Sequence, residues 1–367
     1  MEVVVAPTVN CWKGKRVLVT GHTGFKGGWL SLWLQKNGAD VLGYALAPPT
    51  NPSLFESANV ARGMQSVIGD IRDYDAVAKV MAGFRPEVVF HLAAQSLVIP
   101  SYADPIGTYA TNVMGTVHLL EAARVAANPR AFVVVTSDKC YENSEWVWGY
   151  RESDPMGGRD PYSNSKGCAE LVTAAFRQSY FSAPAAAASP TMALASARAG
   201  NVIGGGDWAT DRLVPDFIRA MGKGEAIRVR RPKATRPWQH VLEPLSGYIR
   251  LAERLLGRDS AGFASGWNFG PAEADTMSVA DLVQILCARW GADASFTLDE
   301  GDHPHEAMLL KLDCSKSRAL LGWRPRLGVN SAIAWTVDWH KAQHTGADMR
   351  AFTLSQIEQF ESTPIPA

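Results

Sequence analysis

RVLVTGHTGFKG, at residues 16–27, is the stretch of this 367-residue chain that decides its fold. Residues 16–20 have the character of a buried parallel strand, and the apolar residues after position 28 have the spacing of a buried helix. Glycines at positions 21, 24 and 27 lie between the two. Glycine lets a backbone approach a pyrophosphate closely, and a helix N-terminus offers free N–H groups and a positive dipole. The stretch therefore predicts a phosphate cradle, although a tight glycine turn would also produce this spacing.

The alternation of strand-like and helix-like segments continues along the chain. Further strands are expected at residues 41–46, 66–70, 88–95, 131–135 and 192–202. This alternation predicts an α/β fold, a Rossmann-type doubly wound parallel sheet with ligands at the carboxyl edge of its strands. We expect a tail at 1–13, a mainly dinucleotide-binding domain at 14–200, a smaller and mainly substrate-binding domain at 201–345 with some chain exchange between the two, and a C-terminal helix and tail at 346–367.

A tyrosine and a lysine share one face of a predicted helix. Asp160 and Pro161 are typical of an N-cap and a first helical residue, since Asp accepts from free backbone N–H groups and Pro lacks one. Tyr162 and Lys166 follow, four residues apart. A cation beside a phenol favours the phenolate, so we expect the Tyr162 pKa to fall from ~10 towards neutrality, which would suit proton transfer from an alcohol. Tyr-x-x-x-Lys is common by chance, but the upstream cradle favours the functional interpretation.

Composition argues against several functional classes. Lys+Arg and Asp+Glu both number 36, so a general nucleic-acid or anionic-membrane binder is not expected. The five cysteines are scattered without a Cys-x-x-Cys, which fits a reducing, cytoplasmic setting. The uncharged stretch 178–197 contains two prolines and is interpreted as a loop leading into a strand. Residues 303–306 (HPHE) lack the spacing of two ligands on one helix face, so no metal site is expected.

From about residue 12 to 325 the chain resembles the CDP-glucose 4,6-dehydratase family, a group of extended short-chain dehydrogenase/reductases. The resemblance rests on residues 20–27 (TGHTGFKG), 136–141 (TSDKCY), the Tyr162/Lys166 pair, 198–208 (RAGNVIGGGDW) and 236–245 (RPWQHVLEPL). The glycine motif at 20–27 and the Tyr162/Lys166 pair are shared by many sugar-nucleotide enzymes. The other three motifs occur in a narrower set of these enzymes.

The resemblance implies NAD in the N-terminal domain and CDP-glucose in the C-terminal one. It implies catalytic roles for Ser137, Asp138, Lys139, Tyr162 and Lys166. It implies cofactor contacts at Gly21, Thr23, Gly24, Phe25, Lys26, Asp70, Ile71, Leu92, Ala93, Ala94, Gln95, Asn112, Tyr162 and Lys166. It implies substrate contacts at Ser96, Asn201, Arg212, Arg236, His240 and Glu306. The second strand ends without an acidic residue or an arginine, so the usual residue does not decide between NAD and NADP.

The implied chemistry is an oxidation followed by an elimination. Tyr162 takes the proton of the sugar 4-hydroxyl while Ser137 hydrogen-bonds the same oxygen, and protonated Asp138 gives a proton to the departing 6-hydroxyl. Asp138 then needs a raised pKa in a poorly solvated site. The broader dehydratase pattern has Thr-Asp-Glu where this chain has Ser137-Asp138-Lys139. The base that removes the C5 proton is therefore open, and Lys139 is a candidate.

Other interpretations share part of this pattern. A sugar-nucleotide 4-epimerase, or a dehydratase for another nucleoside-diphosphate sugar, would use the same cradle, Tyr162 and Lys166, but an epimerase has no need of Asp138 and Lys139. A non-catalytic dinucleotide sensor on this fold would not need the Ser137/Tyr162/Lys166 set. The resemblance further implies deoxysugar synthesis for surface polysaccharide, and a homodimer or homotetramer with helices near 104–127 and 160–180 at the interface.

Overall fold

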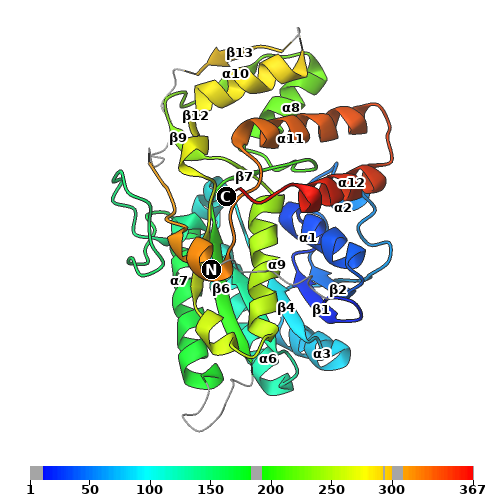
Figure 1. Cartoon of the computed structure of the whole chain (residues 1–367), viewed down its shortest axis with the longest axis vertical. Coiled ribbons are helices and arrows are strands. Elements are labelled where there is room, and N and C mark those ends of the chain that lie inside the picture. The colour runs from blue at the N-terminus through cyan, green and yellow to red at the C-terminus, as the bar shows by residue number, and fades with distance from the viewer. Residues whose placement is uncertain (1–10, 183–191, 292–293, 300–308, 367) are drawn as a thin grey trace.

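The computed structural model describes residues 11–182, 192–291, 294–299 and 309–366 (Figure 1). Its centre is a seven-stranded sheet in the order β11-β6-β5-β4-β1-β2-β3, and every neighbouring pair is parallel. The strands are β1 (Arg16–Thr20), β2 (Asp40–Ala45), β3 (Gln65–Ile68), β4 (Val88–His91), β5 (Ala131–Val135), β6 (Ala193–Ala199) and β11 (Gly266–Phe269). The order reverses between β1 and β4, which is where such sheets bind ligands. The predicted doubly wound parallel sheet is confirmed.

Two layers of helices cover the sheet, because side chains alternate between its faces. On β1, Val17 and Val19 pack with α1 (Phe25–Lys36) and α9 (Leu242–Leu256). Leu18 points the other way and packs with α3 (Tyr74–Phe84) and α6 (Gly115–Ala126). Figure 1 shows α9 lying along the sheet beside β6.

The helices nearest the site begin at aspartate caps, of which the one at Asp160 was predicted. Asp104 accepts a hydrogen bond from the Gly107 backbone, and Asp160 accepts one from the Ser163 backbone. The elements that follow these caps are α5 (Pro105–Tyr109), the π-helical turn η1 (Ala110–Met114), α7 (Pro161–Phe176) and its π-helical end η3 (Arg177–Phe181). Short elements nearby are α2 (Leu54–Ser57), α4 (Val98–Ala103) and η2 (Asp138–Cys140).

The C-terminal half builds a smaller unit, seen at the top of Figure 1. Its helices are α8 (Leu213–Lys223), α10 (Val279–Trp290) and α11 (Val329–His344), which share one apolar core. Three two-stranded pairs accompany them: β7 (Val202–Ile203) with β10 (Gln239–His240), β9 (Thr235–Pro237) with β12 (Thr276–Ser278), and β8 (Ile227–Val229) with β13 (Phe296–Leu298). Shorter turns are η4 (Ser260–Phe263), η5 (Glu273–Asp275) and η6 (Ser317–Leu321), and α12 (Met349–Ser362) closes the chain against α1.

The structure refines several predicted boundaries. The strand expected at 88–95 ends at His91, and the one expected at 192–202 divides into β6 and β7. The seventh strand, β11, and the helix α9 come from the C-terminal half but complete the N-terminal sheet. Among the described helices, none has the length and apolarity that crossing a bilayer requires.

Candidate active site

The loop between β1 and α1 is shaped by close backbone contacts. Gly21 has a φ of +78°, and a Cβ there would lie 2.8 Å from the Ala93 backbone nitrogen at the end of β4. A side chain at Gly27 would run into the Gly21 carbonyl. Gly24 caps α1 without any side-chain hydrogen bond, and the first turn carries no acidic residue. The first N–H groups of α1 thus keep their positive end for a ligand, which fits the diphosphate of a dinucleotide.

Other predicted cofactor residues line the same carboxyl edge. The Thr23 hydroxyl donates to the Leu46 carbonyl at 2.8 Å. Asp70 forms an ion pair with Arg72, and Ile71 is buried behind it. The backbone N–H groups of Leu92 and Ala93 donate to the Thr20 hydroxyl. Phe25, Ala94 and Gln95 are half-buried at the same rim.

Asn112, a predicted cofactor contact, is hydrogen-bonded inside the protein. Its side-chain amide donates to the Gln95 carbonyl and to the Ser165 hydroxyl, and its oxygen accepts from the Gln95 N–H. Both amide hydrogens and the amide oxygen thus have partners inside the protein, and the cofactor contact stays a prediction. Asn112 holds the loop after β4 against α7.

The predicted catalytic residues converge from two elements. Ser137 and Asp138 directly follow β5, while Tyr162 and Lys166 lie at the start of α7, and all four are buried. The Ser137 hydroxyl donates to Asp138 Oδ1 at 3.0 Å and accepts from the Lys139 N–H at 3.2 Å. The Tyr162 N–H donates to the Ser101 hydroxyl at 3.1 Å, which anchors the first turn of α7 on α4.

The expected fall in the Tyr162 pKa is wrong for this structure. Burial raises the Tyr162 pKa to about 12, although a hydrogen bond with Ser137 and the charge of Arg212 act in the other direction. Lys166 is not among the groups that shift this pKa, and its ammonium donates to the Val135 carbonyl at 3.4 Å. Burial and the nearby charge of Lys26 lower the Lys166 pKa to about 8. Desolvation thus outweighs the helical pairing of tyrosine and lysine.

The expected shift of Asp138 is confirmed. Burial raises its pKa, and the charges of Lys139, Lys26 and Arg236 only partly oppose this. Gly200 permits the approach of the carboxyl, because a Cβ there would lie 2.9 Å from Asp138 Oδ2. Lys139 itself is half-buried. The site therefore holds a carboxyl biased towards its neutral, proton-donating form.

Lys26 reaches from the cradle towards these groups. Burial lowers its pKa to about 8, as does the charge of Arg212, while Asp138 and Asp207 favour the charged form. The motif predicted Lys26 as a cofactor contact, but it did not indicate that the ammonium would also lie near Asp138.

The predicted substrate residues are only partly brought together. Arg212, at the N-cap of α8, forms a 2.9 Å ion pair with Asp207 and donates to the Ser96 hydroxyl at 3.4 Å. Arg236 on β9 is half-buried and close enough to Asp138 to affect its pKa. Asn201 is half-buried before β7. Glu306 lies outside the described residues.

His240 lies deeper than the other predicted substrate residues that the structure describes. Its side chain is fully buried, and its ring packs edge-on against Trp29 and Trp335. Burial lowers its pKa to about 3. The ring therefore packs in the apolar core between α1 and α11, and its substrate contact stays a prediction.

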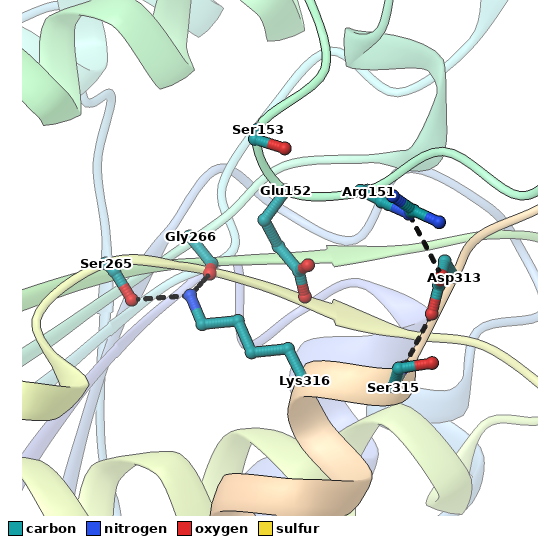
Figure 2. A pocket seen from close by; sticks show the side chains of 8 residues that line it. All are labelled: Arg151, Glu152, Ser153, Ser265, Gly266, Asp313, Ser315 and Lys316. Carbon is teal, nitrogen blue, oxygen red and sulfur yellow. Dashed lines mark hydrogen bonds and ion pairs between the residues drawn. The ribbon is translucent and has the colours of Figure 1, made fainter.

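A separate pocket of about 600 Å³ lies beside β11 (Figure 2). Its charged groups are already engaged, because Arg151 pairs with Asp313 and Lys316 donates to Ser265 and to the Gly266 carbonyl. None of the predicted site residues lines it. Among the described residues, no group of three or more His, Cys, Asp or Glu side chains is placed to hold a metal ion.

Comparison with known proteins places this geometry in a family. The family model described as GDP-mannose 4,6 dehydratase matches residues 18–336. The chain belongs to this family. A CDP-glucose 4,6-dehydratase from Salmonella typhimurium is 57% identical over 353 residues, which are 96% of this chain and 98% of that protein. This confirms the predicted resemblance.

More distant relatives include both dehydratases and epimerases. A dTDP-glucose 4,6-dehydratase from Xanthomonas campestris is 26% identical, covering 89% of this chain and 93% of that protein. A UDP-glucose 4-epimerase structure from Thermotoga maritima superposes with a TM-score of 0.77 at 22% identity, covering 90% of this chain and 99% of that one. A dTDP-glucose 4,6-dehydratase structure from Streptomyces venezuelae, solved with NAD bound, gives a TM-score of 0.74 at 24% identity. The superposition covers 91% of this chain and 99% of that one. Both superpositions show the shared fold.

Two buried residues near the site escaped the sequence interpretation. Glu170 follows Lys166 by one helical turn, and Arg198 lies inside the buried strand β6. They form a 2.8 Å ion pair across 28 residues of sequence. The available signal was a lone charge in the otherwise uncharged run of β6, ALASARA.

Replacing Lys166 with Met should stabilise the folded protein near neutral pH. The Lys166 pKa falls from 10.5 to about 8 on folding. Below pH 8 the folded state must therefore hold a desolvated ammonium at a cost on the order of 3 kcal/mol. The cost disappears as the pH rises from 8 to above 10.5, where neither state is protonated. We expect Lys166→Met to raise the free energy of unfolding at pH 7 and to lose this advantage by pH 10.5, measured by urea unfolding. The exposed Lys79→Met is the control, and an equal gain at both pH values would contradict the prediction.

Proposed function

We propose that this protein is an NAD-dependent CDP-glucose 4,6-dehydratase, a hydro-lyase that forms CDP-4-dehydro-6-deoxy-D-glucose and water. The observation that carries the proposal is Asp138, a buried carboxyl with a raised pKa beside Ser137 and Tyr162. A 4-epimerase breaks no C–O bond and needs no such acid. The 57% identical relative is itself a CDP-glucose 4,6-dehydratase.

The β1–α1 loop is proposed to hold the diphosphate of NAD. The uncapped start of α1, Gly24, Lys26 and the small residues Ala93 and Ala94 fit a dinucleotide lying across β1 and β4. When bound, NAD supplies a hydride acceptor for the oxidation at C4 and a hydride donor for the later reduction at C6. The chain's residues provide the proton transfers and the alignment.

Oxidation at C4 is assigned to Tyr162 and Ser137. The sugar 4-hydroxyl loses its proton to the Tyr162 oxygen, which must be a phenolate at that moment. Ser137 and Arg212 are the neighbours that favour the phenolate against the effect of burial. The Ser137 hydroxyl would hydrogen-bond the same sugar oxygen and hold it in line.

Elimination across C5–C6 is assigned to Asp138 and Lys139. The 4-ketone acidifies the C5 proton, Asp138 gives its proton to the leaving 6-hydroxyl, and a base removes the C5 proton. Lys139 directly follows Asp138 and is half-buried, so we propose it as this base or as its immediate assistant. After water leaves, reduction at C6 is accompanied by proton return to C5.

The sugar diphosphate is assigned to the C-terminal unit. Arg212 and Arg236 come from α8 and β9 and approach the catalytic group, and Arg212 also contacts Ser96 after β4. A guanidinium binds phosphate oxygens through two parallel N–H groups. Asn201 stands at the turn before β7 and completes the proposed contacts.

The product decides between the proposed functions. Purified protein incubated with CDP-glucose should yield a nucleotide sugar lighter by one water, detected by mass spectrometry. An unchanged mass with a new configuration at C4 would identify an epimerase. No change with CDP-glucose, but loss of water from another nucleoside-diphosphate glucose, would overturn the assignment of cytidine.

Tyr162→Phe should abolish turnover and leave CDP-glucose affinity within a few-fold of the parent. The variant removes only the oxygen that accepts the O4 proton and keeps the ring in its buried place. Steady-state kinetics and calorimetry measure the two effects. Tyr74→Phe on α3, outside the site, is the matched control. Turnover of Tyr162→Phe at the parent rate would rule out this role for the phenol.

Lys139→Met should permit oxidation at C4 but stall before elimination. A thioether cannot accept the C5 proton, so the sugar recovered from D₂O should carry little deuterium at C5. Lys139→Arg separates charge from basicity, because arginine keeps the cation but cannot act as a base. We expect both variants to stall. Parent rates of C5 exchange in Lys139→Met would place the base elsewhere, and rescue by Lys139→Arg would leave Lys139 an electrostatic role.

We also propose a homodimer formed through α4, α5 and α7. Exposed apolar side chains gather on these packed helices and their π-helical neighbours, namely Ile99, Tyr102, Ile106, Met114, Leu171 and Tyr180. Such patches mark association surfaces. Ile106→Glu should shift the sedimentation coefficient towards a monomer, whereas Leu320→Glu on η6 should not. A parent protein that sediments as a monomer would refute the proposal.

The five free thiols fit a reducing compartment, so we place the enzyme in the cytoplasm. Recovery in the membrane or secreted fraction would refute this location.

A further inference from the structure

Three hydrogen bonds converge on one buried carboxylate behind the catalytic residues. Glu170 accepts from the Thr136 hydroxyl at 2.5 Å, from the Ser196 hydroxyl at 2.6 Å and from Arg198 Nη2 at 2.8 Å. All four side chains are buried. Burial alone would raise the pKa of Glu170, but Arg198 and the three hydrogen bonds bring it below its ordinary value. The carboxylate is therefore ionised and strongly bound.

These bonds join the two elements that supply the catalytic residues. Thr136 is the residue before Ser137, and its N–H donates to the Ala197 carbonyl at 2.9 Å, so it is held by the sheet where β5 ends. Glu170 lies one turn beyond Lys166 and two turns beyond Tyr162 on α7. The hydrogen bond from Thr136 to Glu170 thus connects the residue before Ser137 with the helix of Tyr162 and Lys166.

Arg198 extends the connection to β11, the edge strand next to β6. Its Nη1 donates to the Tyr141 hydroxyl at 2.7 Å and to the Glu152 carbonyl at 3.1 Å, and Tyr141 donates to Asn268 on β11 at 2.7 Å. Figure 2 shows Glu152 on the wall of the neighbouring pocket, beside Gly266. Tyr141 follows η2, so both ends of the Asp138–Cys140 turn are tied to the same ion pair.

We propose that Thr136, Glu170 and Arg198 are positioning residues that hold Ser137 and Asp138 in register with Tyr162. A buried ion pair is often replaceable by apolar residues without loss of stability, so stability is a weak explanation for it. Fixed geometry is a better one, because acid, phenol and hydroxyl must reach the same sugar within a fraction of an ångström. This inference rests on the proposed dehydratase function and adds residues that do not touch the substrate.

Thr136→Val tests the proposal, since it removes one hydroxyl and keeps the side-chain shape. Glu170 keeps its hydrogen bonds from Ser196 and Arg198 in this variant, so the protein should still fold. We expect kcat for CDP-glucose to fall about tenfold or more, with KM within about twofold, because the substrate arginines are untouched. Thr136→Ser keeps the donor and should restore kcat to within about threefold of the parent.

Thr173→Val is the matched control. Thr173 is also buried on α7, but its hydroxyl donates to the Ala169 carbonyl of the same helix. The Thr173→Val variant should lower Tm about as much as Thr136→Val does, without lowering kcat. Two outcomes would overturn the proposal: equal kcat losses in the two valine variants, or a Thr136→Ser variant as slow as Thr136→Val. Either would show that the Thr136–Glu170 hydrogen bond contributes to stability and not to the positioning of the catalytic residues.

Amide hydrogen exchange gives a readout that does not depend on the substrate. Peptides spanning residues 136–142 should exchange faster in Thr136→Val than in the parent or in Thr136→Ser, while peptides of α3 stay unchanged. If the parent protein is inactive on CDP-glucose, the proposed function is refuted, and amide exchange alone tests the positioning role of Thr136. Unchanged exchange of residues 136–142 in Thr136→Val would then overturn that role.

Discussion

Removal of water from the carboxyl edge of the sheet is the constraint on which the site depends. Asp138, Tyr162 and Lys166 occupy one buried space, and burial moves the pKa of each towards its neutral form. A neutral carboxyl can donate a proton to a leaving hydroxyl, which an exposed aspartate could not do near neutral pH. The same burial makes the phenol harder to ionise. Cations such as Arg212 are therefore as much a part of the acid–base chemistry as the residues that carry the protons.

The two halves of the chain are built into one another. The strand β11 extends the N-terminal sheet, and α9 covers one of its faces. The arginines on α8 and β9 are consequently held against a scaffold that is continuous with the catalytic strand. Gly200 shows how close this union is, since even a methyl group there would meet the Asp138 carboxyl. A substrate held by the C-terminal half would then be presented to β5 without a flexible linker between them.

The fold alone does not choose the reaction. Epimerase and dehydratase structures superpose on this chain with TM-scores of 0.77 and 0.74. The cradle and the Tyr162/Lys166 pair would suit either chemistry, because both begin with oxidation at C4. In the proposed mechanism the distinction lies in the two residues after Ser137, one a buried acid and the other a half-buried amine. That mechanism would let side chains at the end of a single strand choose the reaction on a shared fold.

The sequence by itself determined the parallel sheet, the helix cap at Asp160 and the glycine cradle. These depend on local patterns, namely apolar runs, capping residues and glycine spacing, which are read directly from neighbouring positions. Only the tertiary structure decided the direction of the Tyr162 pKa, the burial of His240, the joining of β11 to the sheet and the pairing of Glu170 with Arg198. Desolvation and ion pairing depend on which distant segments meet, so a spacing that correctly placed Tyr162 and Lys166 on one helical face could not show that the lysine would turn to the Val135 carbonyl.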